Sequence, residues 1–140
     1  MRYLKIALMV ALVGSGLSAV EVQYRGAGMS DEYESADALL DKADSTFQSG
    51  DLGNALQEYQ RVLDLAQKEF NRSVETETLA QIARLLLKTD KKEEGRQWLT
   101  RAGARADDSD PMGYSRYLGV KGRFEWQDGD LSAARKTFDE

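Results

Sequence analysis

The sequence contains neither cysteine nor histidine. Without cysteine there is no disulfide and no thiol nucleophile, and without histidine there is no imidazole base. Together the two absences exclude nearly every common transition-metal site. Any catalysis would have to rely on carboxylates, lysine, tyrosine or serine. Proline occurs once and glycine 12 times, while good helix formers are abundant, so the composition favours long helices separated by glycine-containing turns.

The first residues differ in composition from the rest of the chain. Arg2 and Lys5 precede an unbroken apolar run, residues 6–13, and small residues follow this run. These are the three regions of a secretory signal peptide, so we expect residues 1–19 to direct export to the periplasm or the exterior, with residues 20–34 as a flexible linker. An uncleaved anchor is the alternative, but the apolar run is short for a membrane span. A lipid anchor of the bacterial type would need a cysteine.

Size and charge restrict the partners that the chain can have. With 140 residues, of which 41% are hydrophobic and 31% charged, the chain suits one soluble domain. Removal of the two cations of the signal peptide leaves 17 basic and 24 acidic residues, a net charge near −7. This balance argues against nucleic acid or anionic lipid as a general partner.

One short pattern occurs twice in the sequence. "FQSGDLGNALQEY" (residues 47–59) returns as "WQDGDLSAARKTF" (residues 126–138), and "LKTDKKEEGRQWL" (residues 87–99) is a weaker copy between them. The copies begin 40 and then 39 residues apart, so the period is nearly constant. We therefore expect a repeat domain of residues 35–140. Its repeats are residues 36–72, 74–106 and 111–140, the last one incomplete.

Apolar residues recur at helical spacing within the repeats. In the first repeat the two stripes are Leu39, Leu40, Ala43 and Phe47, and then Ala55, Leu56, Tyr59, Val62, Leu63 and Ala66. Between them, Gly50 suits the left-handed conformation that ends a helix, and Asp51 suits the cap of the next helix. Gly129 and Asp130 repeat this pair of residues. Each repeat is therefore expected to be a helical hairpin.

The third repeat opens with an aspartate and the single proline. Asp110 and Pro111 have the order of an N-cap followed by the first helical position. The acidic run that includes them, residues 107–110, could also suggest calcium. Because the glycine and the distal glutamate of a calcium loop are absent, a capped linker is favoured. We expect no metal and no cofactor.

These features resemble the tetratricopeptide repeat (TPR). The shared positions are Ala43, Gly50, Asp51, Ala55 and Tyr59 in the first repeat, Gly122, Gly129, Asp130, Ala134 and Phe138 in the third, and only Ala83, Asp90, Gly95 and Leu99 in the second. The period is longer than the usual ~34 residues, and the closing proline of the family is missing. With the signal-like start, the resemblance implies an exported bacterial type. It also implies an all-α, right-handed superhelical solenoid of stacked antiparallel helical hairpins, with about three TPR-like repeats.

The repeated small and aromatic residues are expected to serve packing. Ala43, Ala83 and Gly122, with Ala55, Gly95 and Ala134, stand where two helices approach closely, because a larger side chain would separate them. The aromatic residues Phe47, Tyr59, Trp126 and Phe138 are expected to fill the core between hairpins.

By the same resemblance, the first helix of each hairpin lines a concave groove that holds a peptide or a partner helix. The implied groove positions are Asp37, Leu40, Asp44 and Phe47, then Glu77, Ala80, Arg84 and Leu87, and then Arg116, Gly119, Arg123 and Trp126. The spacing of three, four and three residues places each set on one helical face. For the third set a register shifted by one residue stays open.

The charges in this predicted groove are unevenly distributed. Asp37, Asp44 and Glu77 stand toward the first hairpin, whereas Arg84, Arg116 and Arg123 stand toward the third. The arginines could bind an acidic partner segment. Alternatively, Asp44 and Glu77 could neutralise them internally, or the arginines could remain solvated, and this alternative is the one we favour.

The function expected from these patterns is that of a non-catalytic protein–protein interaction scaffold in an extracytoplasmic compartment. Its partner would be a protein or peptide, or further repeats of the same chain. The alternative is a helical accessory or N-terminal region of a larger exported enzyme or assembly, with catalysis elsewhere. A pair of carboxylates working as in a glycosidase is conceivable, but acids in such folds are mostly solvated surface groups.

Overall fold

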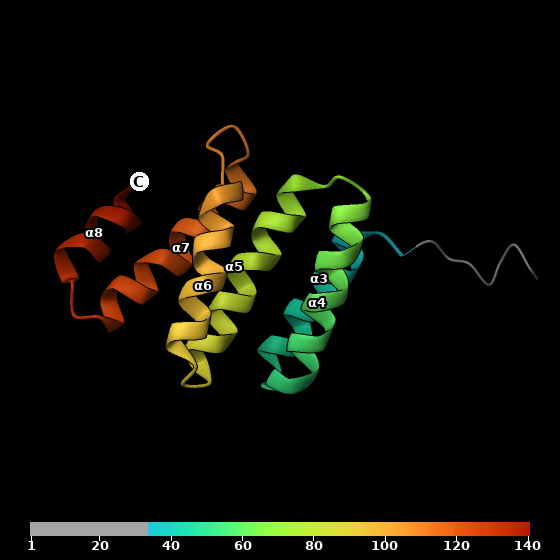
Figure 1. The fold of residues 1–140 in the computed structure, drawn as a ribbon, viewed down its shortest axis with the longest axis horizontal. Helices are drawn as coiled ribbons and strands as arrows, with labels where there is room; N and C mark the ends of the chain where they lie inside the picture. Colours follow the sequence, from blue (N-terminus) through green and yellow to red (C-terminus); the bar gives the residue numbers. More distant parts are fainter. Residues whose placement is uncertain (1–33) are drawn as a thin grey trace, which may run out of the picture. The chain divides into compact units, whose positions relative to one another are not determined.

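The computed structural model describes residues 34–140, which form six α-helices (Figure 1). The helices are α3 (Ala36–Gln48), α4 (Leu52–Lys68), α5 (Arg72–Lys88), α6 (Lys92–Arg105), α7 (Pro111–Gln127) and α8 (Leu131–Asp139). No strand occurs in this part of the chain, so its predicted all-α character is confirmed. The expected signal peptide and residues 20–33 of the expected linker lie outside the described residues. None of the six helices is both long and apolar enough to cross a membrane.

The helices pair as three hairpins, α3 with α4, α5 with α6, and α7 with α8 (Figure 1). The middle hairpin contacts both of the others, mainly through α5, which packs against α3, α4 and α7 as well as α6. As a result, almost every residue of α5 from Val74 to Leu87 is buried. The first helices of the three hairpins are therefore neighbours in space, because α3 contacts α5 and α5 contacts α7.

The turns within the first and third hairpins have the predicted chemistry. Gly50 and Gly129 have φ values of 89° and 82°, a conformation that favours glycine. Asp51 caps α4 by accepting a hydrogen bond from the amide of Asn54, and Asp130 caps α8 by accepting one from the amide of Ala133. These predictions are confirmed. In the second hairpin Asp90 takes the left-handed position, with φ 60°.

The acidic run before α7 acts in capping. Asp110 accepts hydrogen bonds from the amide of Gly113 at 3.3 Å and from the hydroxyl of Ser73 at 2.9 Å, so it joins the start of α7 to α5. Asp107 accepts from both the amide and the hydroxyl of Ser109. The predicted N-cap at Asp110, followed by Pro111 in the first turn, is confirmed.

Small residues lie where the hairpins pack most closely. Ala43, Ala55 and Ala83 are fully buried, and Ala134 is almost so. Gly95 lies against α5 and α7, so closely that an added Cβ would stand 2.9 Å from the ring of Phe124. These contacts agree with the predicted role of the small residues in close helix packing.

Two of the four aromatic residues predicted to lie in the core are exposed. Phe47 and Tyr59 are buried, but Trp126 is 62% and Phe138 is 53% exposed, so the prediction is wrong for these two residues. The physical reason is their position in the third hairpin. Phe47 and Tyr59 are covered by the middle hairpin, whereas no described helix packs against the outer side of α7 and α8.

Candidate functional site

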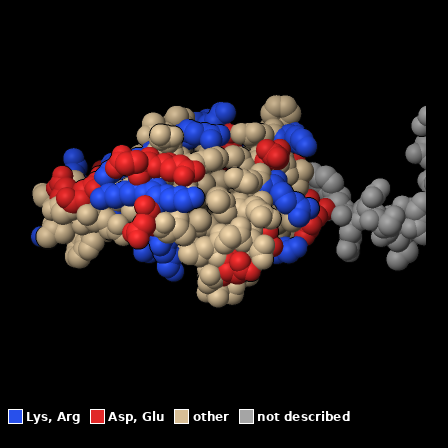
Figure 2. Space-filling model, turned by 60° about the horizontal axis from the view of Figure 1, so that its bottom comes forward, with Lys and Arg blue, Asp and Glu red and all other residues tan. Residues whose placement is uncertain are grey.

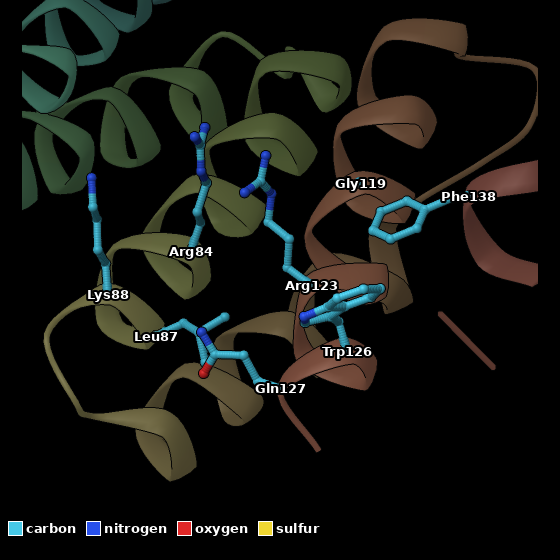
Figure 3. Close-up of a pocket in the computed structure, with 8 residues that line it drawn as sticks. All are labelled: Arg84, Leu87, Lys88, Gly119, Arg123, Trp126, Gln127 and Phe138. Carbon is cyan, nitrogen blue, oxygen red and sulfur yellow. The ribbon is translucent and has the colours of Figure 1, made fainter. Parts of the chain in front are cut away.

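A cavity of about 520 Å³ opens over α5, α7 and α8 (Figure 3). Its lining residues are Arg84, Leu87, Lys88, Gly119, Arg123, Trp126, Gln127 and Phe138. Basic groups, apolar groups and one amide are present, and no carboxylate lines it. Of the residues predicted for the partner groove, the structure brings five together here: Arg84, Leu87, Gly119, Arg123 and Trp126.

Among residues 34–140 no ion pair is found for the cations of this cavity, although Asp44 attracts Arg84 beyond ion-pair distance. Arg84 on α5 and Arg123 on α7 come from neighbouring helices, and their guanidinium groups point to the same side in Figure 3. Burial lowers the pKa of Arg84, and repulsion from Arg123 lowers it further. The guanidinium of Arg84 lies 5.0 Å and the ammonium of Lys88 5.4 Å from the centre of the Phe47 ring. The ring attracts both cations but does not neutralise either charge.

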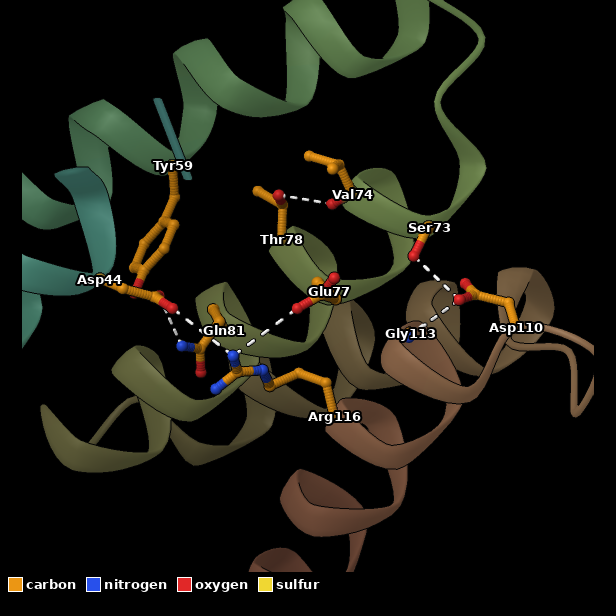
Figure 4. Close-up of polar contacts among 10 residues, drawn as sticks. All are labelled: Asp44, Tyr59, Ser73, Val74, Glu77, Thr78, Gln81, Asp110, Gly113 and Arg116. Carbon is orange, nitrogen blue, oxygen red and sulfur yellow. Dashed lines mark hydrogen bonds and ion pairs between the residues drawn. The ribbon is translucent and has the colours of Figure 1, made fainter. Parts of the chain in front are cut away.

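A separate polar cluster lies beside the cavity (Figure 4). Arg116 on α7 approaches Asp44 on α3 at 3.5 Å and Glu77 on α5 at 3.6 Å. The predicted internal ion pairs are therefore found for Arg116. Within the described part of the chain they are not found for Arg84 and Arg123, because both carboxylates pair with Arg116 instead.

Further hydrogen bonds fix Asp44 in this cluster. The Tyr59 hydroxyl and the Gln81 amide each donate to its Oδ1 at 2.6 Å (Figure 4). Burial, together with the hydrogen bond to Asp44, raises the pKa of Tyr59 far above its ordinary value. Burial also raises the pKa of Glu77, against the opposing effect of Arg116. Through these contacts the cluster joins α3, α4, α5 and α7.

The remaining predicted groove residues lie elsewhere. Asp37 is exposed near the start of α3 and accepts a hydrogen bond from the side chain of Asn71 at 3.1 Å. Leu40, Phe47 and Ala80 are buried in the core. The predicted helical face is thus divided among the core, the polar cluster and the cavity.

Three residues of the cavity were not predicted for it. Lys88 lies one turn after Arg84, a spacing that could have identified it. Phe138 was assigned to the core, and Gln127 follows Trp126 at the end of α7. Their presence depends on how α8 folds back against α7, which the repeat pattern alone does not determine.

Elsewhere on the surface, basic and acidic side chains are interspersed, as the face in Figure 2 shows. Near the turn of the third hairpin, for example, Lys92 and Arg96 both pair with Asp128. The hydrogen bond from Arg96, followed by that from Lys92, holds the pKa of Asp128 well below its ordinary value. Lys92 and Arg96 are thus paired with a carboxylate, whereas no ion pair is found in the described helices for Arg84, Lys88 or Arg123.

Comparisons with known proteins provide no match from which the role of the site could be inferred. No protein-family model, curated protein or solved structure matches the chain. Within residues 34–140, no group of three or more carboxylates is placed to hold a metal ion. What the site offers is a concave surface with clustered positive charge and exposed aromatic rings.

Proposed function

We propose that the chain is a non-catalytic, TPR-like scaffold that binds an acidic segment of a partner protein in an extracytoplasmic compartment. In this proposal the three hairpins form a right-handed solenoid whose first helices line the binding groove. The contacts of α5 with α3 and α7 support that arrangement, because they place the first helices next to one another. The cationic and apolar start of the sequence supports export.

The observation that carries the proposal is the pair Arg84 and Arg123, for which no ion pair is found among the described residues. Two like charges on adjacent helices repel, and Asp44, which attracts Arg84 beyond ion-pair distance, is itself paired with Arg116, as is Glu77. An anion bound between the two guanidiniums would remove the repulsion and gain charge-assisted hydrogen bonds. Carboxylate side chains match the planar donor geometry of arginine.

The apolar part of the cavity supports a peptide as the source of the anion. Trp126 and Phe138 are exposed next to Arg123, and Leu87 forms part of the wall. A peptide can offer carboxylates to the arginines and an apolar side chain to the rings. The acidic charge of the whole chain disfavours long polyanions such as nucleic acid.

The test is a binding titration with three synthetic peptides of equal length. The first alternates glutamate and glycine around a central phenylalanine, and is called the acidic peptide; the others carry glutamine or lysine in place of glutamate. We expect the acidic peptide alone to bind, with an affinity that falls as salt screens the charges. The variant Arg84→Glu/Arg123→Glu should lose about tenfold or more in affinity.

A matched control separates the site from net charge. Arg61 and Arg135 are exposed and lie on α4 and α8, outside the cavity lining. The variant Arg61→Glu/Arg135→Glu has the same net charge as the double variant in the cavity and should bind like the wild type. Equal binding of the glutamine peptide, or equal losses in both variants, would refute the proposal.

A further inference from the structure

Gly119 is a glycine in the interior of α7 that helix packing does not explain. An added Cβ at Gly95, Gly103 or Gly122 would come within 3 Å of a neighbouring side chain, so close contacts account for those residues. At Gly119 nothing lies within 4 Å of an added Cβ. Glycine is a poor helix former, because it lacks a side chain and gains more backbone freedom in the unfolded chain. Its presence in the middle of α7 needs another reason.

Three cavities meet at Gly119. It lines the cavity of about 520 Å³ that holds Arg84 and Arg123, a second of about 260 Å³ beside Arg116, and a third of about 550 Å³ between α7 and α8. Arg84 and Arg123 also line the second cavity, together with Glu77. Phe138 also lines the third, together with Asp108 and Glu140. The three spaces therefore form one trough across α7, which we call the Gly119 trough.

We propose that the extended backbone of an acidic partner peptide crosses α7 directly over Gly119, with its carboxylates toward Arg84 and Arg123 and an apolar side chain toward Trp126 and Phe138. This inference rests on the proposed function and adds the path of the partner. The missing side chain lets a second backbone approach the helix closely. Gly119 is therefore a specificity-determining residue: because it has no side chain, the partner backbone has room to cross α7.

The positive charge of the first cavity, and the lining residues that the three cavities share, favour this occupant. The basic groups lie on one side of Gly119 and the ring of Phe138 lies on the other, as Figure 3 shows. An isolated small anion could satisfy the arginines but would leave the rings and the third cavity unused. A peptide segment contacts all of them, because successive side chains of an extended chain point in opposite directions.

The test substitutes Gly119 with a longer side chain and measures affinity for the acidic peptide. Gly119→Leu adds a side chain at a position where a Cβ has open space, and it should reduce the affinity at least about tenfold. Because leucine is a better helix former than glycine, the melting temperature should stay the same or rise. Gly119→Gln, whose side chain is similar in length but polar, should have the same effect on affinity and decides the question if the leucine variant fails to fold.

Gly53 provides the matched control. It is an exposed glycine of α4 with nothing within 4 Å of an added Cβ, and it lies outside the trough. Gly53→Leu should leave the affinity unchanged. Wild-type affinity in a folded Gly119→Leu or Gly119→Gln variant would overturn the crossing at Gly119 alone, whereas failure of the wild type to bind the acidic peptide would overturn the proposed function as well.

Discussion

Arg116 and Arg84 lie on neighbouring helices but have different electrostatic roles. Arg116 is within ion-pair distance of Asp44 and Glu77, both of which are largely removed from solvent. Loss of this cation would leave two carboxylates close together without compensation, which is strongly destabilising in a protein interior. Arg84, in contrast, forms no ion pair within residues 34–140 and lies over the face of the Phe47 ring. Arg116 thus contributes to stability, and Arg84 is the residue proposed for binding.

The position of Glu77 predicts a specific pH dependence. Burial raises the pKa of Glu77 above its ordinary value of 4.5, so the folded state binds the proton more tightly than the unfolded state does. The contribution of this titration to stability is therefore greatest at low pH and is lost as pH rises through the folded pKa. The Glu77→Gln variant lacks this titration.

We therefore expect the melting temperature of the wild type, relative to that of Glu77→Gln, to increase as pH falls from neutral toward about 4.5. Melting curves of both proteins at several pH values measure this difference. A difference that stays constant or shrinks with acidification would contradict the environment assigned to Glu77.

Gly95 predicts a packing effect at a single position. A methyl group there would lie 2.9 Å from the ring of Phe124 and 3.0 Å from the carbonyl oxygen of Ala83. Phe124 is buried and the oxygen belongs to the backbone of α5, so neither can move aside easily. Gly95→Ala should therefore lower the free energy of unfolding by about 1–3 kcal/mol, despite the better helix propensity of alanine.

Chemical denaturation of Gly95→Ala and Gly53→Ala checks this prediction. Gly53 has open space around it, so its alanine variant should be as stable as the wild type or slightly more stable. Equal stability of the two variants would contradict the close contact between Gly95 on α6 and Phe124 on α7.

Among the helical elements, the turns show how one motif can be built from different residues. Gly50 and Gly129 adopt the left-handed conformation without strain, but Asp90 occupies the corresponding place in the second hairpin. A residue with a Cβ is less stable in this conformation than glycine, although aspartate tolerates it better than most. The second turn is therefore the less favourable one.

Exchanging the residues of two turns tests this difference. Asp90→Gly should raise the free energy of unfolding by about 0.5 kcal/mol, because relief of the left-handed strain exceeds the extra freedom of glycine in the unfolded chain. The reverse change at the first turn, Gly50→Asp, should lower it by about 1 kcal/mol. Urea denaturation of both variants gives the two values, and changes of the same sign would contradict the assignment.

The helices could be predicted from the sequence because their signals are local. Apolar stripes, together with caps such as Asp51 and Asp110, define where each helix lies and begins. The exposure of Trp126 could not be predicted in this way, because an aromatic residue in a repeat is buried only if another hairpin covers it. Repetition in sequence does not mean equal environments in the structure.

The ion pairs were harder to predict than the helices. The spacing placed Arg84, Arg116 and Arg123 on first helices, but which arginine reaches Asp44 depends on the separation and rotation of three helices. Tyr59 and Gln81 also compete for Asp44 as hydrogen-bond donors. These distances arise only from the packed arrangement, so the sequence predicted the groups of the site but not their pairing.

For the molecule as a whole, the main contrast is between net charge and local charge. The chain carries a net charge of −5, yet the cavity that holds Arg84 and Arg123 is lined only by basic and uncharged side chains. An acidic protein with a local basic site attracts a short acidic segment at close range and disfavours large polyanions at long range. This contrast is the basis of the proposed partner selectivity.

The two tryptophans allow the most direct measurement of partner binding at this site. Trp126 lines the trough, whereas Trp98 lies on α6 with its ring against Arg101 and outside the trough. Nuclear magnetic resonance gives one indole N–H signal for each, and Trp126→Phe assigns them. On titration with the acidic peptide, the account predicts that the Trp126 signal shifts in a saturable manner while the Trp98 signal does not, and that Arg84→Glu/Arg123→Glu abolishes the shift. Saturable binding that leaves the Trp126 signal unchanged, or that moves both signals equally, would contradict it.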